Sequence, residues 1–125
     1  MKHINASILN IKPGEVDLIS THTLNLQQQH GFFHAGVTTA IADTAAGYAA
    51  FSLFPKGTDV LTTELKINLL RPAIGSKLIA RGRVIKAGKS LSIAKADVYG
   101  IVENKETHVA TALVSLMQMQ TPSTN

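Results

Sequence analysis

Cysteine is absent from this chain of 125 residues, and tryptophan is absent as well. A chain without cysteine has no disulfide, no thiolate metal site and no thiol nucleophile, and it suits a reducing compartment such as the cytoplasm. Aromatic residues make up only 5% of the chain, and its 12 lysines and arginines are scattered instead of forming runs. Proteins that bind nucleic acid by stacking need both features. The sequence therefore predicts no nucleic-acid partner, although its net charge is +4.

An uninterrupted apolar run long enough to cross a membrane is also lacking. The one long apolar stretch, from Phe32 to Phe54, carries Asp43 at its centre, and a carboxylate in the middle of a bilayer costs about 3 kcal/mol. Residues 1–15 contain no apolar core of the kind that a signal peptide requires. We therefore expect a cytoplasmic protein with no membrane partner. The length suits a single domain over residues 1–125.

The residues that are present favour several strands around one helix. From Ala35 to about Leu53, apolar residues recur at spacings of three and four, and Pro55 and Gly57 follow. The runs that favour strands are 4–11, 16–23, 61–69, 76–85, 91–99 and 108–119, with a segment over 100–107 that holds a turn. Connections of hairpin length make neighbouring strands antiparallel. The predicted fold is therefore α+β, with a long central helix wrapped by one curved antiparallel sheet.

The side-chain pattern also predicts which faces are buried. In the helix, almost every position outside the stripe Val37, Ile41, Ala45 and Tyr48 is Ala, Thr or Gly, so the helix should be buried nearly all round. In the strand that follows, alternation predicts a single half-buried face. The residues of that face are Leu61, Thr63, Leu65, Ile67 and Leu69.

Asp43 is the only formally charged residue between Gly31 and Pro55. A carboxylate in such a helix can act as a general base or as a nucleophile, or it can hydrogen-bond a neighbouring threonine or backbone group. Gly36 lies at the predicted helix start, where free N–H groups and the helix dipole can polarise a carbonyl oxygen. The residues alone leave the catalytic and the structural interpretation of Asp43 open.

Gly36 and Asp43 share a face of the predicted helix but lie about 10 Å apart along its axis. That separation is too large for both groups to act on one carbonyl. Two antiparallel helices that meet across a two-fold axis would bring Asp43 of one chain near Gly36 of the other. The spacing therefore predicts a homodimer with a site shared between its chains.

Two motifs connect these residues with a known family. The run from Gln28 to Gly36 ends in His34-Ala35-Gly36 and is followed by Asp43-Thr44-Ala45, and NLLRP occupies residues 68–72. Together they resemble the hotdog-fold acyl-CoA thioesterases, in particular the PaaI-like branch of phenylacetic acid degradation, which is related to the 4-hydroxybenzoyl-CoA thioesterases. The resemblance covers roughly residues 14 to 119. It departs at Ala35, where the family has a glycine, and we expect the family's leading helix to be absent or reduced.

The resemblance implies a hydrolase that converts acyl-CoA and water to a free acid and CoA, with an aromatic acyl group suggested by the branch. By position, Asp43 would be the base or nucleophile, and the Gly36 amide would polarise the thioester carbonyl. Gln28 would help to place water or the carbonyl, and His34 would organise the loop. The resemblance also implies homodimers, often doubled into homotetramers, and no cofactor or metal, since CoA is part of the substrate.

Six positions are candidates for contacts with the substrate. Arg71, Lys89 and Ser90 are candidates for the CoA phosphates, because basic and hydroxyl side chains suit them. Val37, Thr44 and Asn68 are candidates for contacts with the remainder of the acyl-CoA substrate. Two other functions stay open. A hotdog dehydratase would hydrate an enoyl thioester without releasing thiol, and a non-catalytic acyl-CoA binding module would keep its binding without Asp43.

Overall fold

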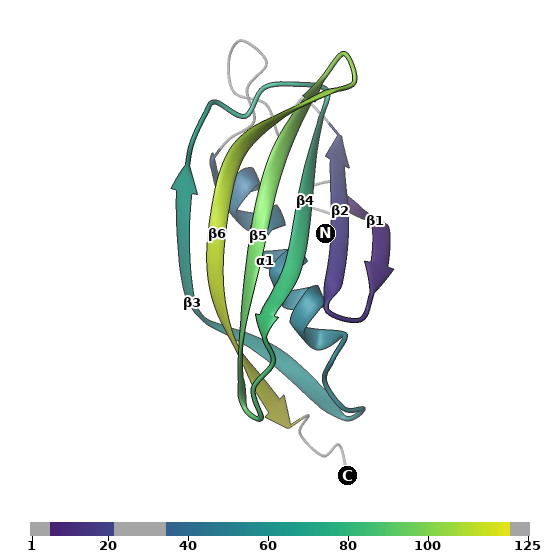
Figure 1. Ribbon diagram of the computed structural model, residues 1–125, viewed down its shortest axis with the longest axis vertical. Helices are drawn as coiled ribbons and strands as arrows, with labels where there is room; N and C mark the ends of the chain where they lie inside the picture. Colours follow the sequence, from purple (N-terminus) through teal and green to yellow (C-terminus); the bar gives the residue numbers. More distant parts are fainter. Residues whose placement is uncertain (1–5, 22–34, 121–125) are drawn as a thin grey trace.

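The computed structural model describes residues 6–21 and 35–120. These residues form two strands, one helix and four further strands (Figure 1). The elements are β1 Ala6–Lys12, β2 Glu15–Thr21, α1 Ala35–Phe51, β3 Thr58–Leu69, β4 Lys77–Lys86, β5 Leu91–Val102 and β6 Lys105–Gln120. The predicted succession of elements is confirmed.

The strands form one antiparallel sheet in the order β1-β2-β4-β5-β6-β3. Strands joined by short turns are neighbours in it, as their connection lengths predicted. β3 is the exception, because it does not pair with β4, which follows it, but crosses to the far side and pairs with β6. Among the described residues, β1 and β3 are therefore the two edges of the sheet (Figure 1).

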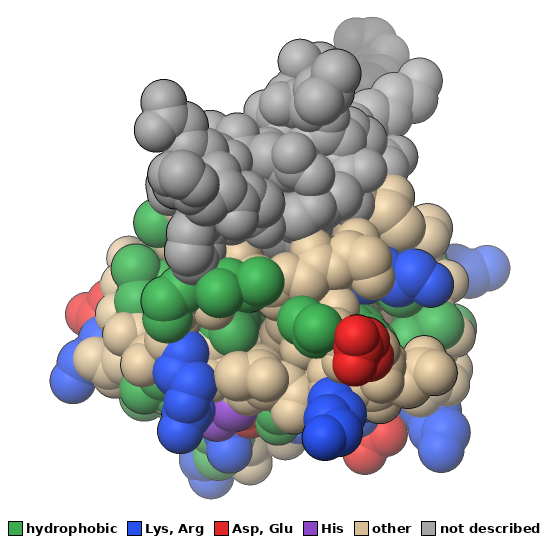
Figure 2. All heavy atoms as spheres, turned by 90° about the horizontal axis from the view of Figure 1, so that it is seen from above, with side chains coloured by type: hydrophobic (Ala, Val, Ile, Leu, Met, Phe, Trp, Pro, Cys, Tyr) green, Lys and Arg blue, Asp and Glu red, His purple; other side chains and the backbone are tan. Residues whose placement is uncertain are grey.

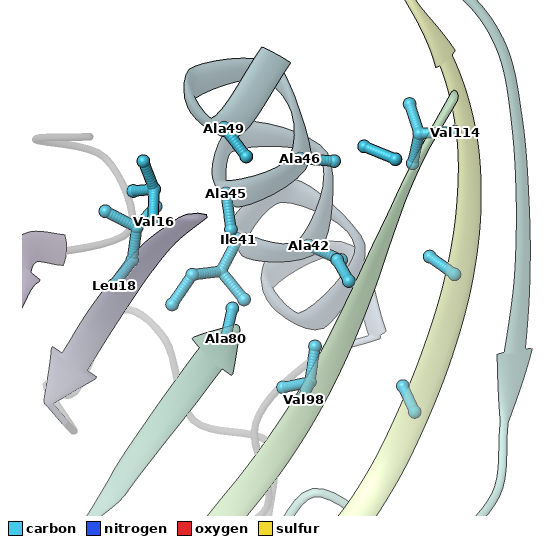
Figure 3. Packing of buried hydrophobic residues seen from close by; sticks show 14 of the residues in the cluster. Val16, Leu18, Ile41, Ala42, Ala45, Ala46, Ala49, Ala80, Val98 and Val114 are labelled. Atoms are coloured by element: carbon cyan, nitrogen blue, oxygen red, sulfur yellow. The ribbon is translucent and has the colours of Figure 1, made fainter. Parts of the chain in front are cut away.

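Helix α1 lies against one face of the sheet, which we call the inner face, and the opposite face is the outer face (Figure 1). Ile41, Ala42, Ala45 and Ala46 have no exposed surface, and their side chains point to the strands (Figure 3). Gly82 in β4 shows how close the two elements come, because a Cβ atom there would lie 2.3 Å from the carbonyl oxygen of Ala45. Small side chains thus set the distance between helix and sheet.

The prediction that the helix is buried nearly all round is wrong. Gly36, Tyr48 and Phe51 are exposed, and Asp43 is half-buried. Gly36 and Asp43 are seven residues apart and share one flank of α1, beside the edge strand β3, whose Thr62 bonds Asp43. The sheet can cover only one side of a single helix, and no other described element covers the second side. Asp43 therefore lies on a flank of the helix that the described residues cover only in part.

Strand β3 also departs from its predicted single face. A register shift between Thr62 and Glu64 marks a β-bulge, which turns the side chains that follow it to the other face. Leu61 consequently lies on the outer face and is 50% exposed, whereas Leu65 is half-buried on the inner face. The prediction of one shared face is therefore wrong. The bulge also leaves Thr62 on the inner face, opposite the buried Leu116.

The turn between the last two strands lies within the predicted segment 100–107, and the strands extend further into that segment than predicted. β5 continues to Val102 and β6 begins at Lys105, so most of the segment 100–107 belongs to the strands. Only Glu103 and Asn104 connect them, with φ angles of 49° and 64°. Two consecutive residues with positive φ form a type I′ turn, whose twist matches that of an antiparallel pair. This geometry allows the strands to pair up to the turn.

No helix in the described part of the chain is long and apolar enough to cross a membrane. Seen from one end of the molecule, basic side chains occupy separate positions, with hydrophobic and uncharged side chains between them (Figure 2). The positive charge is thus dispersed on this face, as the scattered positions in the sequence indicate.

Candidate active site

Asp43 lies in the middle of α1 and is held by the neighbouring edge strand. Its Oδ1 accepts a hydrogen bond of 2.7 Å from the hydroxyl of Thr62 in β3. None of the ion pairs among the described residues includes Asp43. One carboxylate oxygen is therefore fixed by a donor, and none of the contacts between described residues uses the other, which can accept a proton or attack an electrophile.

Thr62 is the residue of this site that the sequence did not identify. By simple alternation, Thr62 belongs to the polar face of β3, pointing away from the helix. The bulge instead places Thr62 on the face that is turned to the helix. No glycine occurs in the bulge, so the sequence does not indicate its position. Thr44, which follows Asp43 directly in the sequence, donates its hydroxyl to the carbonyl oxygen of Ala40 at 2.8 Å and not to Asp43. The threonine that bonds Asp43 thus comes from another element and not from the helix itself.

Gly36 is the second residue of α1 and is exposed. A Cβ atom at this position would meet no described atom within 4 Å, so there is free space beside Gly36 among the described residues. The first turn of the helix contains no acidic side chain. The first N–H groups of a helix have no intrahelical partner and can donate to an oxygen of a ligand. Gly36 and Asp43 remain about 10 Å apart on the same helix, so one chain presents both halves of the site without joining them.

The other candidate residues of the helix are used within the fold. Val37 is only 8% exposed and belongs to the hydrophobic core. Thr39 donates to the carbonyl oxygen of Ala35 at 2.9 Å, in the same way as Thr44. Such bonds to the preceding turn are common for threonine in helices, and within one chain they leave Thr44 only its acceptor capacity for a substrate.

The candidates for binding CoA phosphates lie at opposite ends of the sheet. Arg71 follows β3, and its Nη1 donates to the carbonyl oxygen of His108, near the start of β6, at 2.9 Å. Lys89 and Ser90 lie in the turn between β4 and β5, where the Ser90 carbonyl accepts a bond from Gln118 near the end of β6. A single chain therefore does not bring Arg71 together with Lys89 and Ser90.

Asn68 is exposed on the outer face, on the side of the sheet opposite Asp43. It borders a hollow of about 240 Å³ that is also lined by Lys66, Lys95 and Thr111. Gln28 and His34, together with the loop predicted over residues 24–31, lie outside the described residues. Within the described ranges, no three His, Asp or Glu side chains are grouped as ligands for a metal ion.

A separate polar network covers the outer face. Arg81 of β4 forms two hydrogen bonds with the carboxylate of Glu106, at 2.8 and 2.7 Å, and lies over the ring of Tyr99. Tyr99 stacks on His108, whose Nε2 is 2.9 Å from Oδ1 of Asp97. These contacts link three neighbouring strands on the face that no helix covers.

The carboxylates of this network have shifted pKa values. Burial by itself would raise the pKa of Asp97, but hydrogen bonds from Thr111, Lys95 and His108 outweigh it and hold that pKa below its usual value. The hydrogen bonds from Arg81 lower the pKa of Glu106. Both carboxylates are therefore charged at neutral pH and serve the stability of the outer face.

Several solved structures have a fold similar to that of this chain. A thioesterase family protein from Silicibacter pomeroyi is 40% identical, with a TM-score of 0.93 over 96% of this chain and 88% of that one. The PaaI protein of the phenylacetic acid degradation operon of E. coli is 22% identical, with a TM-score of 0.82 over 96% and 83%. A Bacillus halodurans protein solved with CoA is 22% identical, with a TM-score of 0.81 over 93% and 75%. The helix and its antiparallel sheet are thus a hotdog fold.

The sequence matches the family model described as the thioesterase superfamily over residues 30–103, which is more than half of the chain. The chain therefore belongs to the thioesterase superfamily, as its motifs predicted. A curated relative from Halobacterium salinarum, whose name gives esterase as a provisional assignment, is 37% identical over 70 residues. That match covers 54% of this chain and 46% of the relative, so the chain spans about half of the relative's length.

Proposed function

We propose that the chain is an acyl-CoA thioesterase, in which Asp43 activates water or attacks the thioester directly. The observation that carries this proposal is the hydrogen bond from Thr62 to Asp43, which is half-buried beside β3. A half-buried carboxylate held by one neutral donor in an otherwise apolar helix can act as a base or as a nucleophile. Here one oxygen is oriented by a neutral donor, and no cation competes for the other among the described residues.

The chemistry follows from the groups present. In the first route, Asp43 takes a proton from water while the water oxygen attacks the thioester carbon. In the second, Asp43 forms a mixed anhydride that water then hydrolyses. In both, the C–S bond breaks, CoA leaves as the thiolate and regains a proton, and the acyl group ends as a carboxylic acid. A hydrogen bond from Thr62 holds the carboxylate in place along either route.

The Gly36 amide supplies the second half of the proposed mechanism. The open helix start can donate an N–H to the carbonyl oxygen as negative charge develops on it, and the helix dipole strengthens this effect. A backbone donor and a carboxylate suffice for this hydrolysis, so the proposal uses neither a cofactor nor a metal. Gln28 and His34 keep the supporting roles implied by the family.

We propose that two chains form each site, because Gly36 and Asp43 of one chain are too far apart. The edge position of β3 supports this arrangement. No described strand pairs with its outer edge, and an edge strand can continue a sheet by pairing with a second copy. The helices of the two copies would then lie side by side with their open faces in contact. This dimer would place Asp43 near Gly36 of the second chain.

CoA thioesters are the substrate class that the relatives favour, since one protein of this fold was solved with CoA. Because Arg71 lies far from Lys89 and Ser90 in one chain, they would contact a single CoA only from different chains. The likeness to the PaaI protein supports an aromatic acyl group. A chain without cysteine fits a cytoplasmic enzyme.

The test is the release of free thiol from a panel of aromatic and aliphatic acyl-CoAs. We expect the parent protein to release thiol, and Asp43→Asn to lose this activity by orders of magnitude while its thermal unfolding is unchanged. Glu15→Gln is the matched control, because Glu15 forms a loose pair with Arg83 at 3.8 Å and lies on β2. Hydration of an enoyl-CoA without thiol release would indicate a dehydratase. Binding without turnover, retained in Asp43→Asn, would indicate a binding module.

A further inference from the structure

Strand β3 contains one residue that its pairing with β6 leaves over. Thr62 lies opposite Leu116. The next pair along the strands is Glu64 with Ser115, so Thr63, which stands between the two pairs, has no partner of its own in the ladder. An extra residue of this kind bends its strand and redirects the side chains around it, and β3 bends along its length (Figure 1). Thr63 is therefore the extra residue of the bulge.

The apolar side chains of β3 require a bulge in this segment but do not fix its position. Val60 and Leu65 are both half-buried and pack against the core. They are an odd number of residues apart, whereas side chains on one face of a regular strand are separated by an even number. One extra residue must therefore lie between them. Any position from 61 to 64 would satisfy this condition.

The position of the extra residue decides which threonine faces the helix. In the structure, Thr62 lies on the inner face and donates to Asp43 at 2.7 Å. If the extra residue stood at Leu61 or Thr62, Thr63 would face the helix and Thr62 would point to the outer face. The donor would then lie about 3 Å further along the strand. The hydrogen bond from Thr62 to Asp43 thus depends on the bulge being in its present place.

The side chain of Thr63 makes a contact that favours this place. Its Oγ1 donates a hydrogen bond of 3.2 Å to the backbone carbonyl oxygen of Ser115 in β6. A bulge interrupts the backbone ladder, and this bond connects the two strands at the interruption. It also requires the Thr63 hydroxyl to point to β6 and not to the helix. In the present register both threonine hydroxyls therefore have acceptors, Asp43 for Thr62 and Ser115 for Thr63.

We propose that Thr63 is a positioning residue of the active site, which holds Thr62 against Asp43 by fixing the bulge through its bond to Ser115. This inference rests on the proposed function of Asp43. Thr63 is exposed and bonds β6, so it acts on the reaction only through Thr62. Without the Thr63 hydroxyl, the bulge moves between positions, and only a fraction of the molecules hold the Asp43 carboxylate in its reactive orientation.

Thr63→Val tests this role, because it removes the hydroxyl and keeps the shape of the side chain. Loss of one hydrogen bond between neutral groups should lower kcat for thiol release about fivefold, with KM unchanged. Thr63→Ser keeps the donor and should restore kcat. Thr58→Val is the matched control, because it removes a bond of the same kind in the same strand, from Thr58 to the carbonyl oxygen of Pro55 at 2.6 Å. Equal losses of kcat in Thr63→Val and Thr58→Val, or none in Thr63→Val, would overturn the proposal.

A double-mutant cycle separates positioning from a general loss of stability. In a protein that already carries Thr62→Val, Thr63→Val should lower kcat no further, because the hydroxyl through which Thr63 acts is missing. A fivefold loss on top of that of Thr62→Val would contradict the positioning role.

Carbon NMR supplies a measurement that needs no turnover. The chemical shift of the Asp43 carboxyl carbon should move in the same direction in Thr63→Val and in Thr62→Val, and it should return in Thr63→Ser. A parent protein that releases no thiol but shows these shifts would contradict the proposed function alone. A parent protein that releases thiol, with kcat and the Asp43 shift unchanged in Thr63→Val, would contradict the positioning role alone.

Discussion

The two faces of the sheet are built from different kinds of residue. On the inner face, one row across the strands reads Val16, Gly82, Ala96 and Ala112, and the helix that covers it is rich in alanine. On the outer face, the row beside it contains Asp17, Arg81, Asp97 and Thr111. Adjacent residues of the same strands therefore serve opposite purposes.

This difference shows that side-chain size matters more on the inner face than on the outer face. Backbone atoms of the helix and sheet almost touch at Gly82, so small changes on the inner face must move α1 and with it Asp43. Long side chains of the outer face can adjust, and exposed ion pairs contribute little stability individually. The inner face should therefore tolerate much less change than the outer face.

Gly82→Ala should have the largest effect. Its Cβ atom would lie 2.3 Å from the carbonyl oxygen of Ala45, which is backbone and cannot rotate away. We expect a loss of about 3 kcal/mol in the free energy of unfolding, at the upper end for overpacked sites, measured by denaturant titration. Gly47→Ala is the control, because its new Cβ atom would meet only Leu116 at an ordinary 3.9 Å. Similar stabilities for the two variants would show that the contact is not tight.

Thr62→Val tests the link from the inner face to the site. It removes the hydroxyl that donates to Asp43 and keeps the shape of the side chain. A hydrogen bond to a charged group is worth about 2 kcal/mol, so kcat/KM for thiol release should fall roughly 30-fold. Thr62→Ser keeps the donor and should restore most of the activity. Equal loss in both variants would assign the effect to packing.

Thr38→Val should stabilise the protein. The Thr38 hydroxyl is buried in α1, and it is the one buried side-chain polar atom of the described residues that lacks a hydrogen-bond partner. Replacing it by a methyl group should raise the free energy of unfolding by about 1 kcal/mol. Thr39→Val, which loses a bond to Ala35, should gain nothing. A destabilised Thr38→Val in thermal unfolding would contradict this expectation.

Asp97→Asn should have the smallest effect, one seen in the pH dependence of stability. The pKa of Asp97 is lowered in the folded chain, so its charged form stabilises the fold above the unfolded-state pKa of about 3.9. This contribution disappears as pH falls through the lower folded pKa. The midpoint of unfolding should therefore fall less steeply below about pH 5 in Asp97→Asn than in the parent. If the midpoint falls equally steeply with pH in the variant and the parent, Asp97 does not contribute to the acid sensitivity of the fold.

Much of the fold could be predicted from the sequence, because periodicity and turn residues act locally. The helix was expected from Ala35 to about Leu53, and the structure describes α1 over Ala35–Phe51. The errors have non-local causes. The alternating pattern of β3 gives no sign of the bulge before Glu64, which depends on pairing with β6. The composition of α1 suggested burial all round, but one sheet can cover only one side.

The sequence by itself determined the succession of elements, the position of Asp43 relative to Gly36 and the family, since all three depend on residue types and their spacing. Only the tertiary structure decided that Thr62 is the partner of Asp43, that Asp43 lies beside the edge strand β3, and that Arg71 is remote from Lys89. Each of these depends on which strand lies beside which, and strand pairing joins residues far apart in the chain.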